Sequence, residues 1–307
     1  MEAASSPAAL HDDFEIAATA SIYDRRPRTL KHGESFAVFD HSGDVVGLSG
    51  SAEGLYHRDT RYLSQYYLTI ENGIRPILLS SSVRDDNSVF TCDLTNPDIV
   101  GLENGHPLQN DILHIRRTRI LFDGRLYERL TFANYGEEPL SSWVTIHFDC
   151  DFADLFEVRG ATRLRRGTPL PPECEQSVAT LSYRGLDEIT RRTRLEFAPP
   201  PQNLTARQAE FRLALEPRRT MTILVEIACD GPPDILQPLR HRMVRAYRET
   251  RNGVRRHASR AAAISSSNDI FNQSIRRCIA DTYMLVTDTE YGPFPYAGIP
   301  WYSTAFG

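Results

Sequence analysis

Two short segments of the sequence bring together side chains that could do chemistry. The first, residues 54–64, contains His57, Arg58, Asp59 and Arg61. Polar groups this dense are costly to bury unless they pair with one another or with a ligand. One interpretation is a loop that reaches a catalytic pocket or the next domain, with both arginines donating to hydroxyls or carboxylates. The other, which we favour, is an internal Asp59–Arg61 network that fixes a turn.

The second segment, residues 149–160, is rich in carboxylates. They are Asp149, Asp151, Asp154 and Glu157. A glycosidase needs two carboxyl groups about 5–5.5 Å apart for retention, or about 6.5–9.5 Å apart for inversion, so a catalytic pair is conceivable. The apolar residues between them instead indicate a buried turn after a strand. The last three carboxylates would cap that turn and pair with Arg159, and we assign no catalytic residue here.

Composition excludes several classes of protein. Of the 307 residues, 41% are hydrophobic and 24% are charged. No apolar run approaches the roughly 20 residues of a membrane-spanning helix, so no membrane partner is expected. The net charge of −5 gives no reason to expect nucleic acid as a partner. Residues 1–20 contain no Lys or Arg, which does not fit a secretory signal and predicts a cytoplasmic location.

Nothing in the sequence signals metal or cofactor chemistry. The cysteines are widely spaced and never form a C-x-x-C pair, and His57 with Asp59 is not by itself a metal site. Lys31 is the only lysine among 35 basic residues and lies outside any glycine-rich run, so no phosphate-binding loop is present. We therefore expect neither a metal nor a cofactor.

Alternating hydrophobicity dominates residues 34–230 and predicts half-buried strands. Every second residue is apolar in the stretches 144–152, 211–215 and 221–229. Asp123-Gly124 separates two such stretches and predicts a tight hairpin, because both turn positions must tolerate a positive φ. Many short strands joined in this way predict a mainly β protein with an antiparallel β-sandwich.

After residue 231 the period of the pattern changes to that of a helix. Leu239, Met243 and Tyr247 share one face, and a second helix is predicted from about Asn268. Residues 240–260 are strongly basic. Such a helix could dock on nucleic acid, but we favour a solvated linker helix between domains.

The last twelve residues point to a known family. The run from Gly298 to Gly307, Gly-Ile-Pro-Trp-Tyr-Ser-Thr-Ala-Phe-Gly, closely resembles the opening of the catalytic helical barrel in bacterial amylo-α-1,6-glucosidases of the glycogen-debranching type. Residues 56–64, 119–134 and 151–160 resemble the N-terminal domain of the same family. The Arg-Asp pair that would come next in that family is missing. The sequence therefore resembles the non-catalytic N-terminal part of such an enzyme.

This resemblance implies an arrangement of domains. It implies a flexible N-terminal tail over residues 1–30, a sandwich domain over 31–232, a helical linker over 233–266, and the first helix of a truncated (α/α)6 barrel over 267–307. The whole enzyme would hydrolyse α-1,6-glucosidic branch points of glycogen-like polysaccharide or oligosaccharide, with its catalytic carboxylates beyond Gly307. The family's pocket would use the aromatic motif. Trp301 would contact sugar while Tyr302 and Phe306 line the wall, unless Trp301 only packs in the barrel core.

Two other functions stay open. The chain could be a non-catalytic glucan-binding module that holds polysaccharide on exposed aromatic residues such as Tyr66, Tyr67 and Trp143. Alternatively, the enzyme could act on another α-glucoside, since related barrels share the aromatic motif. The sequence does not indicate the oligomeric state.

Overall fold

The computed structural model describes residues 27–47, 51–71, 73–100, 107–231, 236–259, 262 and 264–295 of the chain. Within these residues the protein is mainly β, all paired strands are antiparallel, and there are three helices. The predicted mainly β fold is confirmed. None of the helices in the described ranges is long and apolar enough to cross a membrane.

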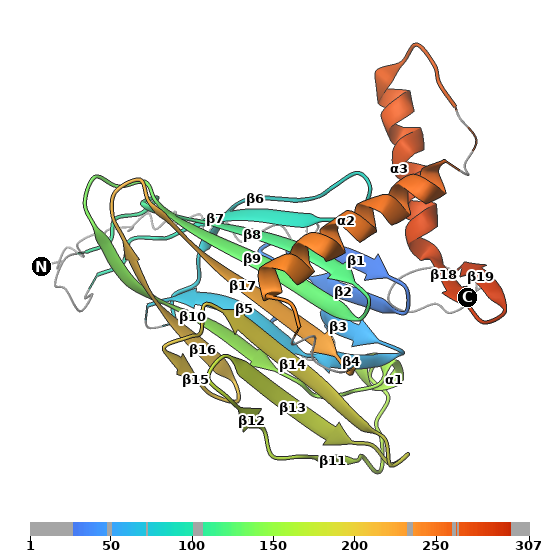
Figure 1. Cartoon of the computed structure of the whole chain (residues 1–307), viewed down its shortest axis with the longest axis horizontal. Helices are drawn as coiled ribbons and strands as arrows, with labels where there is room; N and C mark the ends of the chain where they lie inside the picture. Colours follow the sequence, from blue (N-terminus) through green and yellow to red (C-terminus); the bar gives the residue numbers. More distant parts are fainter. Residues whose placement is uncertain are drawn as a thin grey trace, which may run out of the picture.

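The larger layer of the molecule is a nine-stranded sheet (Figure 1). It consists of β6 (Ile77–Val83), β7 (Phe90–Thr95), β8 (Leu113–Phe122), β9 (Arg125–Asn134), β11 (Thr168–Pro169), β12 (Glu173–Cys174), β13 (Val178–Arg184), β14 (Thr190–Ala198) and β17 (Thr220–Cys229). The strand order is β11–β13–β14–β17–β9–β8–β7–β6, and β12 also pairs with β13. The long strands β8, β9 and β17 therefore lie near the middle of the sheet.

Two four-stranded sheets pack against this layer. One consists of β1 (Arg28–His32), β2 (Ser35–Phe39), β3 (Gly54–His57) and β4 (Thr60–Leu63), in that order. The other consists of β5 (Gln65–Ile70), β10 (Leu140–Asp149), β15 (Asn203–Leu204) and β16 (Gln208–Leu215), in the order β15–β16–β10–β5. One continuous hydrophobic core joins all three sheets, which makes the architecture a sandwich.

The predicted alternation builds this core. In β10 every second residue from Leu140 to Phe148 is buried, and in β17 the side chains of Ile223, Val225 and Ile227 point into the same core. Burying such a side chain stabilises the fold by about 1.5–3 kcal/mol. The predicted hairpin is also confirmed, since Asp123 and Gly124 join β8 to β9 with φ values of 49° and 69°.

Two long helices follow the sandwich. They are α2 (Leu239–Ala258) and α3 (Asp269–Leu285), and after α3 the chain forms a small hairpin of β18 (Val286–Thr289) and β19 (Gly292–Pro295). The predicted start of α3 is confirmed, because the side chain of Asn268 accepts a hydrogen bond of 3.1 Å from the amide of Phe271. Near that start, however, Ile270 and Phe271 are 77% and 47% exposed, so the described part of the chain leaves this apolar surface uncovered.

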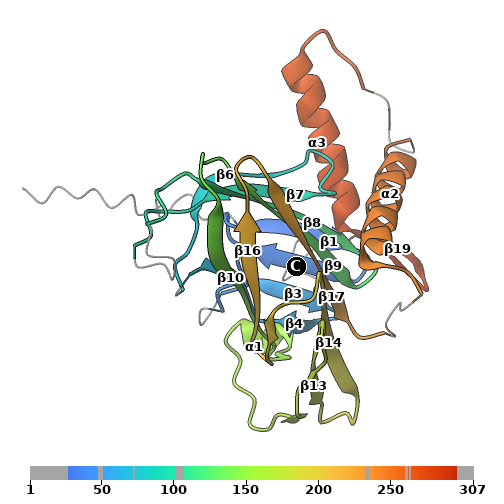
Figure 2. The same cartoon turned by 60° about the vertical axis from the view of Figure 1, so that its left-hand side comes forward.

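Helix α2 is docked along one face, so it is not solvated all round as the sequence suggested. Its role as a linker between domains stays a prediction. The helix crosses the outer face of β8 and β17 (Figure 2), where Leu239 and Ala246 pack on Tyr127. Arg242 is 1% exposed. Its guanidinium bonds Glu226 at 2.8 Å and Glu196 at 2.6 Å, so charge pairing as well as apolar contact docks the helix on the sheet. We call Glu196, Glu226 and Arg242 the outer cluster.

A second ionic network lies inside the sandwich. We call it the inner cluster, and its members are Asp44, Tyr66, Arg117, Arg119 and Glu128. Glu128 accepts from Nε of Arg117 at 2.8 Å and from Nε of Arg119 at 2.9 Å. Arg117 also bonds Asp44 at 2.5 Å, and the Tyr66 hydroxyl donates to Glu128 at 2.5 Å. Burial opposes the ionisation of Glu128, but the charges of the two arginines outweigh it and hold its pKa at about 2.

Candidate functional site

The β3–β4 hairpin has an unusual turn. Arg58 and Asp59 occupy both central positions, with φ values of 45° and 62°. Two-residue hairpin turns of this hand favour Gly or Asn, because a side chain makes the left-handed conformation costly. Strained backbone of this kind is concentrated at functional sites, where surrounding contacts must hold it. The polar segment singled out in the sequence is therefore a strained, solvent-facing hairpin tip.

Contacts with two neighbouring segments hold the tip in place. Nε of Arg58 bonds Glu34 at 2.7 Å, and the Arg58 amide donates to the Glu34 carbonyl at 3.2 Å. On the other side, the amide of Leu155 donates to the Asp59 carbonyl at 3.1 Å. The carboxylate of Asp59 lies near that of Glu34, and burial together with the Glu34 charge raises the pKa of Asp59.

Arg61 does not form the expected network with Asp59. Its guanidinium instead pairs with Asp151 through two bonds, Nε to Oδ1 at 3.1 Å and Nη2 to Oδ2. Arg61 lies along Gly54, where a Cβ atom would come within 2.6 Å of the arginine Cδ. Because Gly54 has no side chain, the Arg61 side chain can extend past it and away from the hairpin tip, whereas Asp59 lies in the turn itself. The expectation of an Asp59–Arg61 pair was wrong because residues two apart in this hairpin point toward different neighbours.

His57 sits behind the tip among carboxylates. Its Nδ1 lies 2.8 Å from the Ser35 hydroxyl, and its ring packs edge-on against Tyr62, whose hydroxyl donates to Asp230. Burial and the charge of Arg58 lower the pKa of His57, against opposing effects of Glu34, Asp230 and Asp123. The imidazole is therefore neutral at pH 7. It can exchange hydrogen bonds there without carrying charge.

These residues form one polar surface, which we call the hairpin edge. It comprises Glu34, His57, Arg58, Asp59, Asp123 and Asp230. The sequence singled out only the three from the β3–β4 hairpin. The other three each adjoin a turn glycine, at positions 33, 124 and 231. The turn glycines beside these three acidic residues are visible in the sequence. They would predict a common surface only if the order of the strands were already known.

The carboxylate-rich segment behaves as a structural turn. Helix α1 (Leu155–Val158) begins at Asp154, whose side chain accepts from the amides of Phe156 and Glu157, while Glu157 bonds back to the Asp154 amide at 3.1 Å. This reciprocal cap confirms the predicted capping role. Asp154 forms an ion pair with Arg163, and Glu157 forms one with Arg166.

The proposed sugar-binding aromatics fall in different environments. Trp301, Tyr302 and Phe306 lie outside the described residues. Tyr66 was wrongly expected to be exposed: it is 1% exposed and belongs to the inner cluster, because position 66 of β5 points into the core. Tyr67 and Trp143 are half-buried on the outer face of their sheet, and the Tyr67 ring stacks on His147 at 4.5 Å.

The hairpin edge offers charge and hydrogen bonds, but no metal site. Among the described residues, no group of three His, Cys, Asp or Glu side chains is arranged to hold a metal ion. Several of its polar groups already have partners, since Arg58 bonds Glu34, His57 contacts the Ser35 hydroxyl and Asp230 accepts from Tyr62. Such a surface suits the positioning of a neighbouring polar partner more than the activation of a bond.

Comparison with known proteins identifies similar sequences and folds. A family model described as the N-terminal domain of some glycogen debranching enzymes matches residues 30–226. No curated protein matches the sequence. A solved structure assigned as a kojibiose phosphorylase from the human microbiome aligns with a TM-score of 0.57 and 11% identity. The alignment covers 84% of this chain and 39% of that one, so this chain spans well under half the length of its structural relative.

Smaller solved structures align less well. A protein assigned as an aldose 1-epimerase from Escherichia coli K12 has a TM-score of 0.39 and 9% identity, over 67% of this chain and 99% of that one. A galactose mutarotase related enzyme from Lactobacillus acidophilus has a TM-score of 0.38 and 9% identity, over 68% and 98% of the two chains.

Proposed function

Because the chain belongs to the family of N-terminal domains of glycogen debranching enzymes, we propose that it is the sandwich and linker part of a cytoplasmic glycoside hydrolase that cleaves α-1,6-glucosidic branch points of glycogen-like glucans. The family match over residues 30–226 carries the proposal. Residues 31–232 would be the sandwich domain, 233–266 the helical linker and 267–307 the start of an (α/α)6 barrel. The catalytic carboxylates would lie on the barrel, after residue 307.

The path of the chain after the sandwich supports this arrangement. Nζ of Lys31 donates to Thr287 at 2.7 Å and to the Val286 carbonyl at 3.3 Å, and the Thr287 hydroxyl donates to the Gly33 carbonyl at 3.2 Å. These bonds bring the segment after α3 beside the β1–β2 turn. Glu34 in that turn belongs to the hairpin edge. The hairpin edge therefore adjoins the segment that would lead into a following domain.

In this proposal the hairpin edge positions the barrel. Arg58 and Asp59 would make polar contacts with barrel loops, and Trp301, Tyr302 and Phe306 would line the sugar pocket those loops surround. The strained turn would be useful because it holds two charged side chains at a fixed point on a rigid scaffold. His57 and Arg61 would brace the turn from behind.

The first experiment compares the longer protein with the 307-residue chain. A branched limit dextrin is the substrate, and released glucose is the readout. We expect hydrolysis by the longer protein and none by residues 1–307. Hydrolysis by the 307-residue chain would overturn the placement of the catalytic groups. Inactivity of the longer protein on α-1,6 linkages would overturn the substrate.

A substitution in the longer protein tests the hairpin edge. Asp59→Asn should lower kcat/KM by about tenfold, the equivalent of one lost charged contact. Glu188→Gln is the matched control, since Glu188 is also an exposed acidic residue between two strands with a similar φ, 63° against 62°. Equal activities of the two variants would show that the tip does not position the barrel.

A further inference from the structure

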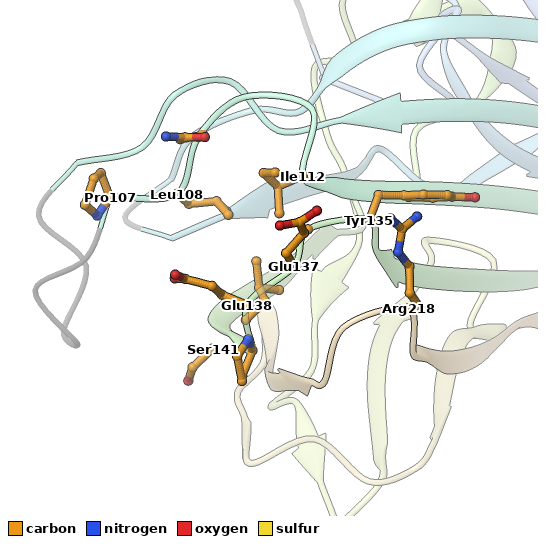
Figure 3. A pocket seen from close by; sticks show the side chains of 12 residues that line it. Pro107, Leu108, Ile112, Tyr135, Glu137, Glu138, Ser141 and Arg218 are labelled. Carbon is orange, nitrogen blue, oxygen red and sulfur yellow. The ribbon is translucent and has the colours of Figure 1, made fainter.

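A pocket of about 570 Å³ lies at one end of the sandwich. Figure 3 shows the side chains that line it. The loop before β8, the turn between β9 and β10, and the turn between β16 and β17 form its walls. The hairpin edge lies at the far end of β8 and β9, ten residues away along each strand, which corresponds to about 30 Å. The pocket is therefore separate from the surface that adjoins the linker. Its volume falls within the roughly 300–1,000 Å³ of small-ligand sites.

One wall of the pocket is held by a buried asparagine. Asn96 is fully buried, and its Oδ1 accepts from the amides of Ile112 and Leu113 at 3.1 and 2.7 Å. Its Nδ2 donates to the carbonyl of Gln109 at 2.6 Å. These bonds satisfy the amide side chain on both sides and fix the loop that carries Leu108, Gln109 and Ile112.

A second buried asparagine holds the opposite wall. Nδ2 of Asn134 donates to the carbonyls of Glu138 and Leu215 at 2.8 and 3.0 Å, and its Oδ1 accepts from the Gly136 amide at 2.8 Å. A Cβ atom at Gly136 would approach Ile112 to 3.0 Å, so the turn also packs closely on the first wall. Backbone bonds of 3.0 and 3.1 Å join Asn134 to Arg218 and Arg219. The pocket is thus preformed, which lowers the entropic cost of binding a ligand.

The side chains that face this preformed space are available to a ligand. Tyr135 is 56% exposed, and its ring rests edge-on against His114 at 5.8 Å. Within the described ranges, no hydrogen bond or ion pair engages the carboxylates of Glu137 and Glu138 or the guanidinium of Arg218. Figure 3 shows Tyr135, Glu137 and Arg218 around the same space. This contrasts with Glu34 and Arg58 of the hairpin edge, which bond to each other at 2.7 Å.

The aromatic ring, the two carboxylates and the guanidinium that line the pocket together indicate which class of ligand it could bind. Two carboxylates disfavour a phosphate or another anion, and the polar lining disfavours a purely apolar molecule. A neutral polyhydroxyl ring suits all three kinds of group. Its C–H face can stack on the Tyr135 ring, the carboxylates accept from vicinal hydroxyls, and Arg218 donates to them.

We propose that this pocket is a secondary sugar-binding site for a segment of α-glucan chain. The choice of glucan rests on the proposed function, whereas the sugar class rests on the lining of the pocket. A polymer held here would keep its other segments near a catalytic domain attached at the opposite end of the sandwich. Binding at this site would raise the effective concentration of branch points at that domain.

The test is calorimetric titration of the 307-residue chain with maltoheptaose at concentrations up to about 10 mM, a range that detects millimolar binding. Tyr135→Ala and the double variant Glu137→Gln/Glu138→Gln are compared with Tyr291→Ala. Tyr291 is the matched control because it is 93% exposed and lies on the β18–β19 turn. We expect binding by the unaltered chain, about tenfold weaker binding by the pocket variants, and no change in the control.

Two results would overturn the proposal. The first is no binding by the unaltered chain, and the second is equal binding by Tyr135→Ala. Branch-point hydrolysis by the longer protein is measured separately. Hydrolysis without binding would refute only the pocket, whereas binding without hydrolysis would refute only the proposed enzymatic function.

Discussion

The inner and outer clusters use the same chemistry in two different places. In the inner cluster, Glu128 and both of its arginines are at most 1% exposed, and all partners belong to the sandwich. In the outer cluster, Glu226 and Arg242 are equally buried, but Glu196 is 21% exposed and Arg242 comes from a helix outside the family match. The inner cluster is therefore part of the core of the fold, and the outer cluster joins the fold to its linker.

This difference shows how the surroundings of an ion pair decide its role. Arg119 has two guanidinium nitrogens without hydrogen-bond partners, and its charge lies 4.9 Å from the Phe39 ring centre and 5.1 Å from that of Tyr66. Within the part of the chain that the structure describes, Glu128 is the carboxylate bonded to Arg119, and the two aromatic faces add to its compensation. Glu226, in contrast, has a second partner in Arg125 at 2.7 Å. Loss of one partner should therefore cost more in the inner cluster.

The largest loss of stability is expected when the inner cluster is disrupted. Glu128→Gln removes the carboxylate that bonds Arg119 and leaves this buried guanidinium without its bonded counterion, so we expect a loss of about 3–5 kcal/mol in the free energy of unfolding. Urea denaturation measures it. Glu216→Gln, in an exposed turn, should stay within about 0.5 kcal/mol of the unaltered protein. A small change for Glu128→Gln would mean that the network contributes little to the fold.

A smaller effect is expected in the outer cluster. Arg242→Met removes the bonds to both carboxylates, but Glu226 keeps Arg125. We therefore expect a loss of about 1–3 kcal/mol in the free energy of unfolding. The loss should be local. Hydrogen exchange should accelerate over residues 239–258 and leave β8, β9 and β17 protected.

The exposed residue Arg248 on the same helix supplies the control for this substitution. Arg248→Met should leave the exchange of α2 unchanged. Faster exchange throughout the sandwich of Arg242→Met would contradict the division into a core cluster and a joining cluster.

The remaining expected effect on stability is seen only in acid. The pKa of Glu128 is held at about 2 in the folded protein, below its ordinary value of 4.5. A depressed carboxyl pKa contributes stability that is complete above about 4.5 and is lost as the pH falls toward 2, by up to about 1.4 kcal/mol per pH unit. The gap in unfolding free energy between the unaltered protein and Glu128→Gln should stay constant from pH 7 to 5 and shrink below that. A gap that stays constant down to pH 3 would contradict the role of the Glu128 charge.

Much of the fold could be predicted from local pattern. Alternating apolar residues located β10, β16 and β17, the Asp123-Gly124 pair located a hairpin, and Asn268 marked the start of α3. Each of these signals lies within a few residues of the feature it predicts. The docking of α2 could not be predicted in this way. The partners of Arg242 are Glu226 and Glu196, which lie 16 and 46 residues away along the chain and belong to two different strands.

The candidate site was only partly predictable for the same reason. The density of polar groups in residues 57–61 identified the hairpin tip, but the partner of Arg61 lies ninety residues away, at Asp151. The pocket at the end of the sandwich opposite the hairpin edge was not predicted from the sequence. Its walls come from three turns that only the strand order brings to one end of the sandwich.

The sequence by itself determined the elements of this protein, its mainly β class and the family to which it belongs. Periodicity and turn chemistry act between near neighbours, so they can be seen along the chain. Tertiary structure alone decided which polar residues pair with one another and which remain available to a ligand. It decides this because hydrogen bonds and charge pairing depend on distance in space, and antiparallel sheets bring together residues that are far apart in sequence.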